Sequence, residues 1–78
     1  MGVKDVLEYI ARNLVDDPDA VSVTEVQGDG SVILKLSVAA EDMGKVIGRR
    51  GRTARAIRDV VRAAGTLSGV TAVVEIVE

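Results

Sequence analysis

Two glycines, Gly48 and Gly51, interrupt a sequence that has a helical pattern on both sides. Residues 41–47 begin with two carboxylates, which are favoured at a helix N-terminus because they face the positive end of the helix dipole. Residues 52–64 carry apolar side chains at helical spacing, namely Ala56, Ile57, Val60, Val61 and Ala64. Because glycine reaches backbone angles that other residues avoid, we predict two helices joined by a tight turn at residues 48–51.

The N-terminal half predicts one helix and a β-hairpin. Residues 3–15 have apolar side chains at helical spacing, and the Asp-Asp-Pro segment 16–18 ends this helix because the residue before a proline avoids helical geometry. Residues 21–27 and 32–38 are rich in β-branched side chains and roughly alternate in polarity. The glycines in residues 28–30 predict a tight turn between them, so the two strands form an antiparallel hairpin.

The C-terminal segment predicts how the sheet is completed. We expect residues 65–69 to form a loop and residues 70–77 (VTAVVEIV) to form the last strand. Two helices between strands 32–38 and 70–77 are long enough for a right-handed crossover, which makes these two strands parallel. The sequence therefore predicts a single α+β domain over residues 1–78, in the order α-β-β-α-α-β, with a three-stranded mixed sheet and all helices on one face.

Charge is distributed unevenly along the chain. The formal net charge is −2, yet residues 44–62 hold seven basic side chains against Asp59, a local charge of +6, and all other residues together carry −8. Four arginines lie opposite the apolar face of the helix after the turn, at Arg52, Arg55, Arg58 and Arg62. A solvated helix face more often mixes acids with bases, and arginine suits bidentate contact with phosphate. The pattern favours anion or nucleic-acid binding over a solvated face.

Missing residue types exclude several classes of function. The chain contains no Cys and no His, which removes disulfides, Cys/His nucleophiles, Ser-His-Asp triads and the usual zinc sites. We therefore expect no enzyme activity, no catalytic or metal-binding residue and no cofactor. No apolar run is long enough to span a bilayer, and no secretory signal is visible. The sequence predicts a cytoplasmic protein without a membrane or a small-molecule substrate among its partners.

The segment Val46-Ile47-Gly48-Arg49-Arg50-Gly51 is followed by an amphipathic helix with Ile57 six residues beyond the second glycine, and it resembles the signature of the KH (K-homology) domain. With one helix and one strand ahead of the core, the element order is similar to the type II KH topology of bacterial proteins. A single domain with D-M-G-K-V-I-G-R-R-G-R-T resembles the KhpA family of small RNA-binding proteins over its whole length. Ala54 departs from the general pattern, which often has a bulkier aliphatic residue there.

The resemblance implies a binding site. In KH domains the GxxG loop clamps the backbone of about four single-stranded nucleotides, and their bases lie in a shallow apolar groove. The implied site consists of the clamp residues Gly48, Arg49, Arg50 and Gly51 and of outer phosphate contacts at Lys45, Arg52 and Arg55. Val46 and Ile47 either line the floor of the groove or belong to the core.

The resemblance also implies RNA chaperone activity and a Jag-type partner with its own KH domain (KhpB), acting in control of cell elongation, cell shape and peptidoglycan homeostasis. Tyr9, the only aromatic residue, is on the first predicted helix. Stacking of bases on an aromatic ring near the groove is therefore unavailable, and weak single sites favour association of several. Ala56 and Val60, at the edge of the apolar face, predict self-association or pairing with another KH protein through helix 52–64.

Three alternatives stay open at this stage. The clamp is compatible with single-stranded RNA or single-stranded DNA, because it contacts the backbone. The assembly is either a homodimer or a heterodimer. The chain is also compatible with an interaction module whose KH fold mainly holds a protein partner. A pull-down in which partner binding survives Arg49→Asp/Arg50→Asp while RNA binding is lost would separate the two roles.

Overall fold

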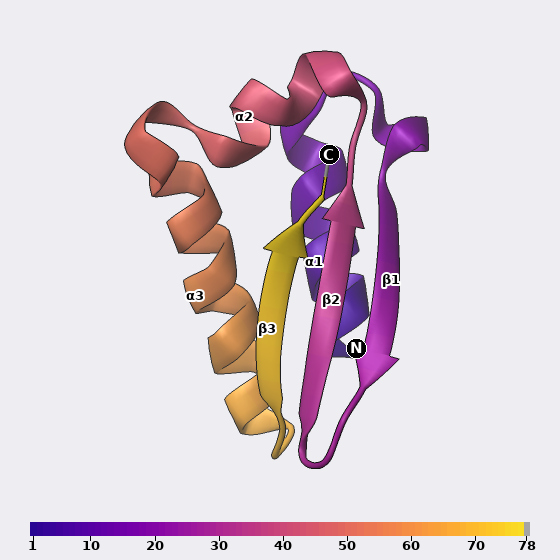
Figure 1. Ribbon diagram of the computed structural model, residues 1–78, viewed down its shortest axis with the longest axis vertical. Coiled ribbons are helices and arrows are strands. Elements are labelled where there is room, and N and C mark those ends of the chain that lie inside the picture. The colour runs from indigo at the N-terminus through magenta and orange to yellow at the C-terminus, as the bar shows by residue number, and fades with distance from the viewer. Residues whose placement is uncertain (78) are drawn as a thin grey trace.

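The computed structural model describes residues 1–77 and confirms the predicted α+β order α-β-β-α-α-β (Figure 1). Short 3₁₀ turns lie between several of the elements. The helices and strands are α1 (Val3–Leu14), β1 (Ser22–Gln27), β2 (Ser31–Ser37), α2 (Met43–Ile47), α3 (Arg52–Leu67) and β3 (Thr71–Ile76). Most boundaries lie within one or two residues of the sequence prediction.

The sheet has the strand order β1-β2-β3. Strands β1 and β2 are antiparallel, with Val26 opposite Ile33, and β2 and β3 are parallel, with Leu34 opposite Val74. Both the predicted hairpin and the predicted parallel crossover are confirmed. Helices α2 and α3 form this crossover, so the turn between them lies at the end of the sheet where β2 and β3 terminate (Figure 1).

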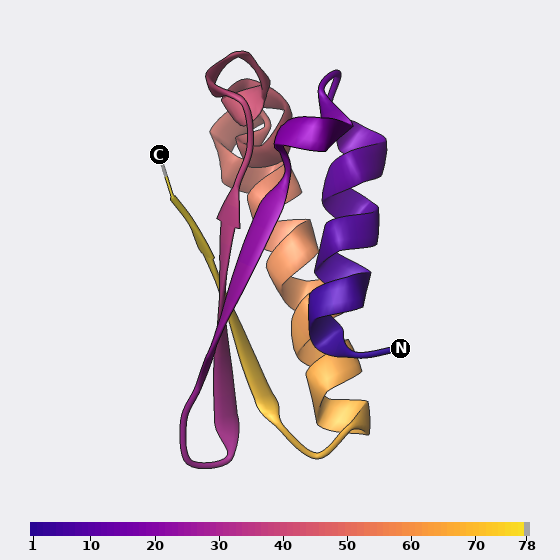
Figure 2. The same cartoon turned by 90° about the vertical axis from the view of Figure 1, so that its right-hand side faces the viewer.

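The helices cover one face of the sheet and leave the other open, as Figure 2 shows edge-on. Alternate residues of β2 point toward the helices, and among them Leu34 and Leu36 are fully buried. They meet Leu7 of α1 and Val61 of α3 in one cluster of buried side chains. The core of this chain is therefore built from many small aliphatic contacts, because it contains no Phe and no Trp.

The predicted loop 65–69 is wrong in its first part, since α3 continues to Leu67. A Cβ atom on Gly65 would lie 2.9 Å from Cβ of Ala72, so this glycine permits close packing of α3 on β3 and does not end the helix. Gly69, two residues beyond the end of the helix, has φ +80°. The N–H of Val70 donates to the Gly65 carbonyl at 2.9 Å, which gives a Schellman-type C-terminus.

Candidate nucleic-acid interface

The turn between α2 and α3 is fixed by backbone hydrogen bonds. The Gly48 N–H donates to the Gly44 carbonyl at 2.8 Å and ends α2, and the Gly51 N–H donates to the Gly48 carbonyl at 3.2 Å. Gly48 and Gly51 have φ angles of +73° and +74°, a region that glycine adopts without strain. Residues 49–51 form a single 3₁₀ turn, and both arginine side chains on it are exposed.

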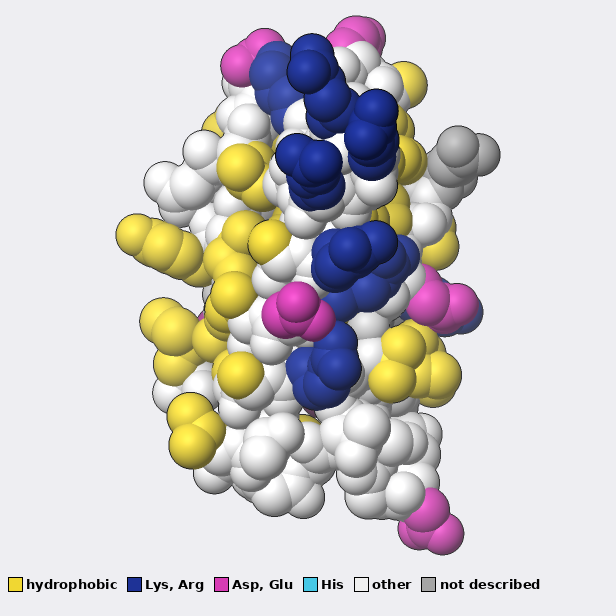
Figure 3. Space-filling view, turned by 90° about the vertical axis from the view of Figure 1, so that its left-hand side faces the viewer, with side chains coloured by type: hydrophobic (Ala, Val, Ile, Leu, Met, Phe, Trp, Pro, Cys, Tyr) yellow, Lys and Arg dark blue, Asp and Glu magenta, His cyan; other side chains and the backbone are white. Residues whose placement is uncertain are grey.

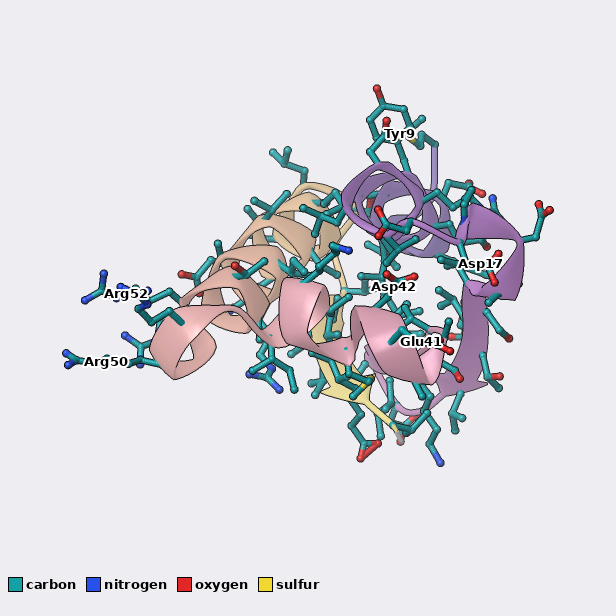
Figure 4. All side chains as sticks on the ribbon, turned by 90° about the horizontal axis from the view of Figure 1, so that it is seen from above. Tyr9, Asp17, Glu41, Asp42, Arg50 and Arg52 are labelled. Atoms are coloured by element: carbon teal, nitrogen blue, oxygen red, sulfur yellow. The ribbon has the colours of Figure 1, made fainter. Side chains whose placement is uncertain are left out.

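Arg50 adopts a left-handed conformation, with φ 58° and ψ 25°. It is the only non-glycine residue with positive φ among residues 1–77. This conformation costs roughly 1–2 kcal/mol for a residue with a Cβ atom, and such strain tends to cluster at functional sites. The side chains of Arg50 and Arg52 both project away from the body of the domain (Figure 4).

Helix α3 begins directly after the turn, at Arg52. Within residues 1–77, no side chain caps its N-terminus. The N–H groups of its first turn and the positive end of its dipole therefore face the same side as the loop arginines, an arrangement that attracts anions. Figure 3 shows basic side chains running as a band from this end of the molecule down α3.

An open groove of about 540 Å³ adjoins the turn. Its lining residues come from α2, α3 and the end of β3 and are Met43, Ile47, Gly51, Ala54, Arg58, Ile76 and Val77. Ile47 is 39% exposed and faces this groove, whereas Val46 is fully buried in the core. The structure thus places Val46 in the core and Ile47 in the groove, whereas the sequence allowed either position for both. The small side chain of Ala54 contributes to the hollow between α3 and β3.

The outer edge of β3 supplies polar groups to the groove. The N–H groups of Thr71 and Val77 donate to β2 and its flanking turn, so in a parallel ladder the intervening odd-numbered residues also point their backbone groups toward β2. The backbone groups of Val74 and Ile76 consequently face the opposite edge, which pairs with no other strand within residues 1–77. An apolar floor beside the backbone N–H and C=O groups of a strand edge suits flat heterocycles with polar edges.

Arg58 is a groove residue that sequence reasoning missed. Its Nε donates to the carbonyl oxygen of Val74 at 3.4 Å, and its side chain lines the groove described above. The helical wheel had grouped it with the exposed arginines of α3. The available signal was its spacing, because Gly51, Ala54 and Arg58 lie three and four residues apart and share one face of the helix.

A family model described as "KhpA/KhpB, KH domain" matches residues 4–76. The chain belongs to this family. It is 56% identical over 75 residues to the "RNA-binding protein KhpA" of Clostridium acetobutylicum, covering 96% of this chain and 100% of that protein. It is 45% identical over 76 residues to the protein of the same name from Aquifex aeolicus, covering 97% of this chain and 96% of that one.

A solved structure shares the fold. The crystal structure of the Aquifex aeolicus Era variant Y63A bound to GDP·AlF4⁻ matches 95% of this chain with a TM-score of 0.65, at 17% sequence identity. The match covers 29% of the Era chain. At this level of sequence identity the match is a likeness of fold alone.

Behind the KH loop, Asp42 connects α2 to the segment between α1 and β1. Its side chain is almost fully buried, and its carboxylate accepts hydrogen bonds from the backbone N–H groups of Asp16 and Asp17, at 3.2 and 3.1 Å. Figure 4 shows Asp42 directed from the start of α2 toward this segment. The sequence assigned Asp42 only to the start of a helix, but its carboxylate makes no capping hydrogen bond to α2.

The charge of Asp42 is stabilised in place. Burial raises the pKa of its carboxyl, but the two backbone N–H donors and nearby Lys45 outweigh burial, and the pKa lies below its usual range. Lys45 Nζ is 3.6 Å from Asp42 and also pairs with Asp16. The hydrogen bond to Asp16 is the main reason that the pKa of Lys45 is raised. The ammonium of Lys45 is therefore already neutralised, unlike the loop arginines.

A second, wholly apolar hollow of about 390 Å³ lies between α1 and α3. Its lining residues are Ile10, Leu14, Thr53, Ala56, Ile57 and Val60. Val60 is 51% exposed. Figure 3 shows hydrophobic side chains on both sides of the basic band. The KH domain thus exposes an apolar surface on α3 that is separate from the groove beside the loop.

No helix within residues 1–77 combines the length and hydrophobicity needed to cross a membrane.

Proposed function

We propose that this protein binds single-stranded RNA, with the loop at residues 48–51 clamping the sugar-phosphate backbone. The observation that carries the proposal is the position of the strained Arg50 turn, which joins an uncapped helix N-terminus to an apolar groove with an unpaired strand edge. Phosphates would meet the positive end, and bases would enter the groove. The name "RNA-binding protein KhpA" of several relatives supports the same ligand.

The proposed contacts fall into three groups. The clamp consists of Gly48, Arg49, Arg50 and Gly51. Arg52 and Arg55 on the first turns of α3 would bind neighbouring phosphates, and Lys45 would contribute less because Asp16 and Asp42 hold its ammonium. Ile47 would contact the bases, with Val46 supporting it from the core.

A four-nucleotide site without an aromatic stacking partner is weak, and we propose that this chain gains affinity by association through α3. The apolar hollow at Val60 and Ala56 is the specific feature that favours this second role. Its occupant would be a second copy or a Jag-type KH protein (KhpB). In this proposal the chain acts in the cytoplasm as an RNA chaperone, in RNA-level control of cell elongation and peptidoglycan homeostasis.

A charge-reversal experiment tests RNA binding. We expect Arg49→Asp/Arg50→Asp to abolish binding to a fluorescein-labelled U₈ RNA in fluorescence anisotropy, while circular dichroism stays unchanged because both side chains are exposed. The matched control is Lys4→Asp/Lys35→Asp, which changes the net charge equally but away from the loop. The clamp assignment is wrong if the folded loop variant binds like wild type, or if both variants lose affinity equally.

The two roles are separable in the same variant. The loop variant should lose RNA but retain a KH partner, because the apolar hollow lies between α1 and α3. Parallel binding to dU₈ DNA determines whether the site also accepts a strand without 2′-hydroxyls.

A further inference from the structure

Strand β1 forms the edge of the sheet that lies opposite β3, and it pairs with no strand other than β2 within residues 1–77. Figure 2 looks onto this edge, and no other helix or strand of residues 1–77 covers it. The pairing with β2 runs through Ser22–Gln27 without a bulge, and this segment contains no Pro, Lys or Arg. Bulges, prolines and lysines are the features by which proteins usually protect a free edge. The edge of β1 is therefore open to a further strand.

The hairpin turn determines which backbone groups of β1 point outward. The Gly28 N–H donates to the Ser31 carbonyl at 2.9 Å, and in an antiparallel ladder hydrogen-bonded pairs alternate with pairs that are not hydrogen-bonded. Counting back from Gly28, the even-numbered residues of β1 bond to β2. The N–H and C=O groups of Val23, Glu25 and Gln27 consequently point away from β2, and no other backbone group within residues 1–77 bonds to them.

The two faces of β1 specify the side chains that a fourth strand would carry. On the open face of the sheet, Val26, Ile33 and Val73 form one row across the three strands. Val26 is 42% exposed and Val73 is 46% exposed, and an apolar side chain beside Val26 would extend this row. On the other face, the exposed side chains of Glu25 and Gln27 are hydrogen-bonded to each other. They would meet polar side chains of the incoming strand.

Charge selects a basic strand as the occupant of this edge. Residues 17–30 hold four carboxylates and no basic side chain. All four are exposed, and within residues 1–77 none of them forms an ion pair; they belong to Asp17, Asp19, Glu25 and Asp29. A second copy of the chain that used all the outward groups of β1 would place two copies of Glu25 opposite each other, and like charges in that position are destabilising.

We propose that the edge of β1 binds an extended segment of a partner protein as a fourth strand, in which basic and apolar side chains alternate. The backbone groups of Glu25 and Gln27 supply hydrogen bonds, while the side chains of Glu25 and Val26 select the alternation. This edge is separated by the width of the sheet from the groove beside β3 (Figure 1). The chain can therefore hold such a partner while the groove is occupied.

The test is an NMR titration of the ¹⁵N-labelled full chain with the peptide TKVKVKT. Saturable shifts with a dissociation constant of about 1 mM or below are expected from a few backbone hydrogen bonds and one charge pair. At a peptide concentration about ten times that constant, amide exchange of Glu25 and Gln27 should slow about tenfold. The N–H groups of Thr24 and Val26 are already bonded to β2, so their exchange should change less.

Two control peptides separate alternation from charge. TEVEVET keeps the alternation but reverses the charge, and TKKVVKT keeps the composition of TKVKVKT without its alternation. Both should bind about fivefold or more weakly than TKVKVKT, because one opposes Glu25 and the other cannot place all its lysines on one face.

Proline variants test the outward N–H groups directly. Glu25→Pro and Gln27→Pro each remove one of these donors, and the second does so without a change of charge. Each should lower the affinity about tenfold or more, because the proline ring also occupies the place of the lost hydrogen. Proline is tolerated at such positions of an edge strand, since the donor that it removes does not bond to β2. Circular dichroism verifies that the variants fold.

Charge variants complete the design. Glu25→Gln keeps the N–H and removes the carboxylate, so it should weaken TKVKVKT several-fold and strengthen TEVEVET. Glu75→Gln is the matched control, because it removes an exposed carboxylate from β3, two strands away. It should change the affinity less than about twofold.

Several results would overturn the proposal. These are the absence of saturable shifts with about 10 mM TKVKVKT, equal binding of the three peptides, or slowed exchange that is not centred on Glu25 and Gln27. Binding like that of wild type by a folded Gln27→Pro variant, or equal effects of Glu25→Gln and Glu75→Gln, also overturns it.

Discussion

Gly48 and Thr53 are packed so closely that a Cβ atom on Gly48 would lie 2.7 Å from Cβ of Thr53 and 3.0 Å from its backbone nitrogen. Thr53 is in the first turn of α3, whereas Gly48 follows the last residue of α2. The contact therefore sets how closely the two helices approach. Gly48 also has φ +73° and ψ 175°, a region that is essentially restricted to glycine.

The first prediction is that Gly48→Ala destabilises the domain by about 2 kcal/mol or more, because backbone strain adds to the clash with Thr53. Gly30→Ala is the matched control. Gly30 also has positive φ, at +68°, but no atom lies within 4 Å of the place where its Cβ would stand, so only the backbone cost of about 1 kcal/mol applies. Urea unfolding measures both, and equal losses would show that the contact with Thr53 is unimportant.

The second prediction separates binding from stability at Arg50. Arg50→Gly should keep the free energy of unfolding or raise it by up to about 1 kcal/mol, because glycine accepts φ 58° without strain. RNA affinity should nevertheless fall several-fold, since one phosphate contact is lost. The measurements are urea unfolding and fluorescence anisotropy.

Arg49→Gly is the control for that experiment, because Arg49 does not have a positive φ. It removes the same charge without relieving strain, so it should lower stability. An Arg50→Gly protein that is as destabilised as Arg49→Gly would contradict the assignment of strain to Arg50.

The sequence predicted the fold well because the periodicity of apolar residues sufficed to identify each element. The strand alternation of β2 and the helical spacing in α1 correspond directly to buried faces. Gly65 misled the prediction, because a glycine within a helix can signal either an end or a close approach. Only the three-dimensional position of Ala72 distinguishes the two.

The loop residues of the candidate site were predictable, since a GxxG turn between helices is a local motif. The partners of the charged side chains were not. Asp42 is 25 residues from Asp17 in sequence, and Arg58 is 16 residues from Val74. Long-range contacts of this kind depend on how the crossover places β3 and the α1–β1 segment, which no local pattern specifies.

The third prediction concerns pH. The pKa of Asp42 in the folded state is lowered below the usual 3.8. The ionised carboxylate therefore stabilises the fold, and this stabilisation is fully present at pH values above the usual pKa. This contribution is lost as the pH falls through the lowered pKa. Asp42→Asn should unfold at a lower urea concentration than wild type at pH 7, and the difference should shrink below about pH 4.

Asp29→Asn, in the exposed hairpin turn, removes the same charge away from this network and serves as the control. A stability difference between wild type and Asp42→Asn that stays constant from pH 7 to pH 3 would argue against a role for the charge of Asp42. The loss would then reflect only altered packing.

The fourth prediction concerns assembly. Val60→Asp places a carboxylate in the apolar hollow between α1 and α3 and should abolish self-association or pairing with another KH protein. Sedimentation velocity at high protein concentration measures it. Leu67→Asp is the control, because Leu67 is on the same helix and 91% exposed but outside the hollow. A wild type that stays monomeric and finds no KH partner would contradict this prediction.

The last prediction follows from the division of charge between the basic segment 44–62 and the acidic remainder. If the loop and the start of α3 contact three or four phosphates, the logarithmic salt slope for single-stranded RNA should be roughly −2 to −3. Raising salt from about 50 to 200 mM should then weaken binding roughly 20- to 50-fold. Duplex RNA should bind less well, because its paired bases cannot enter the groove. Anisotropy titrations of U₈ and of a duplex across a salt series test both statements. Salt-insensitive binding, or preference for the duplex, would mean that the arginine band is a solvated face and that holding a protein partner is the main role of this fold.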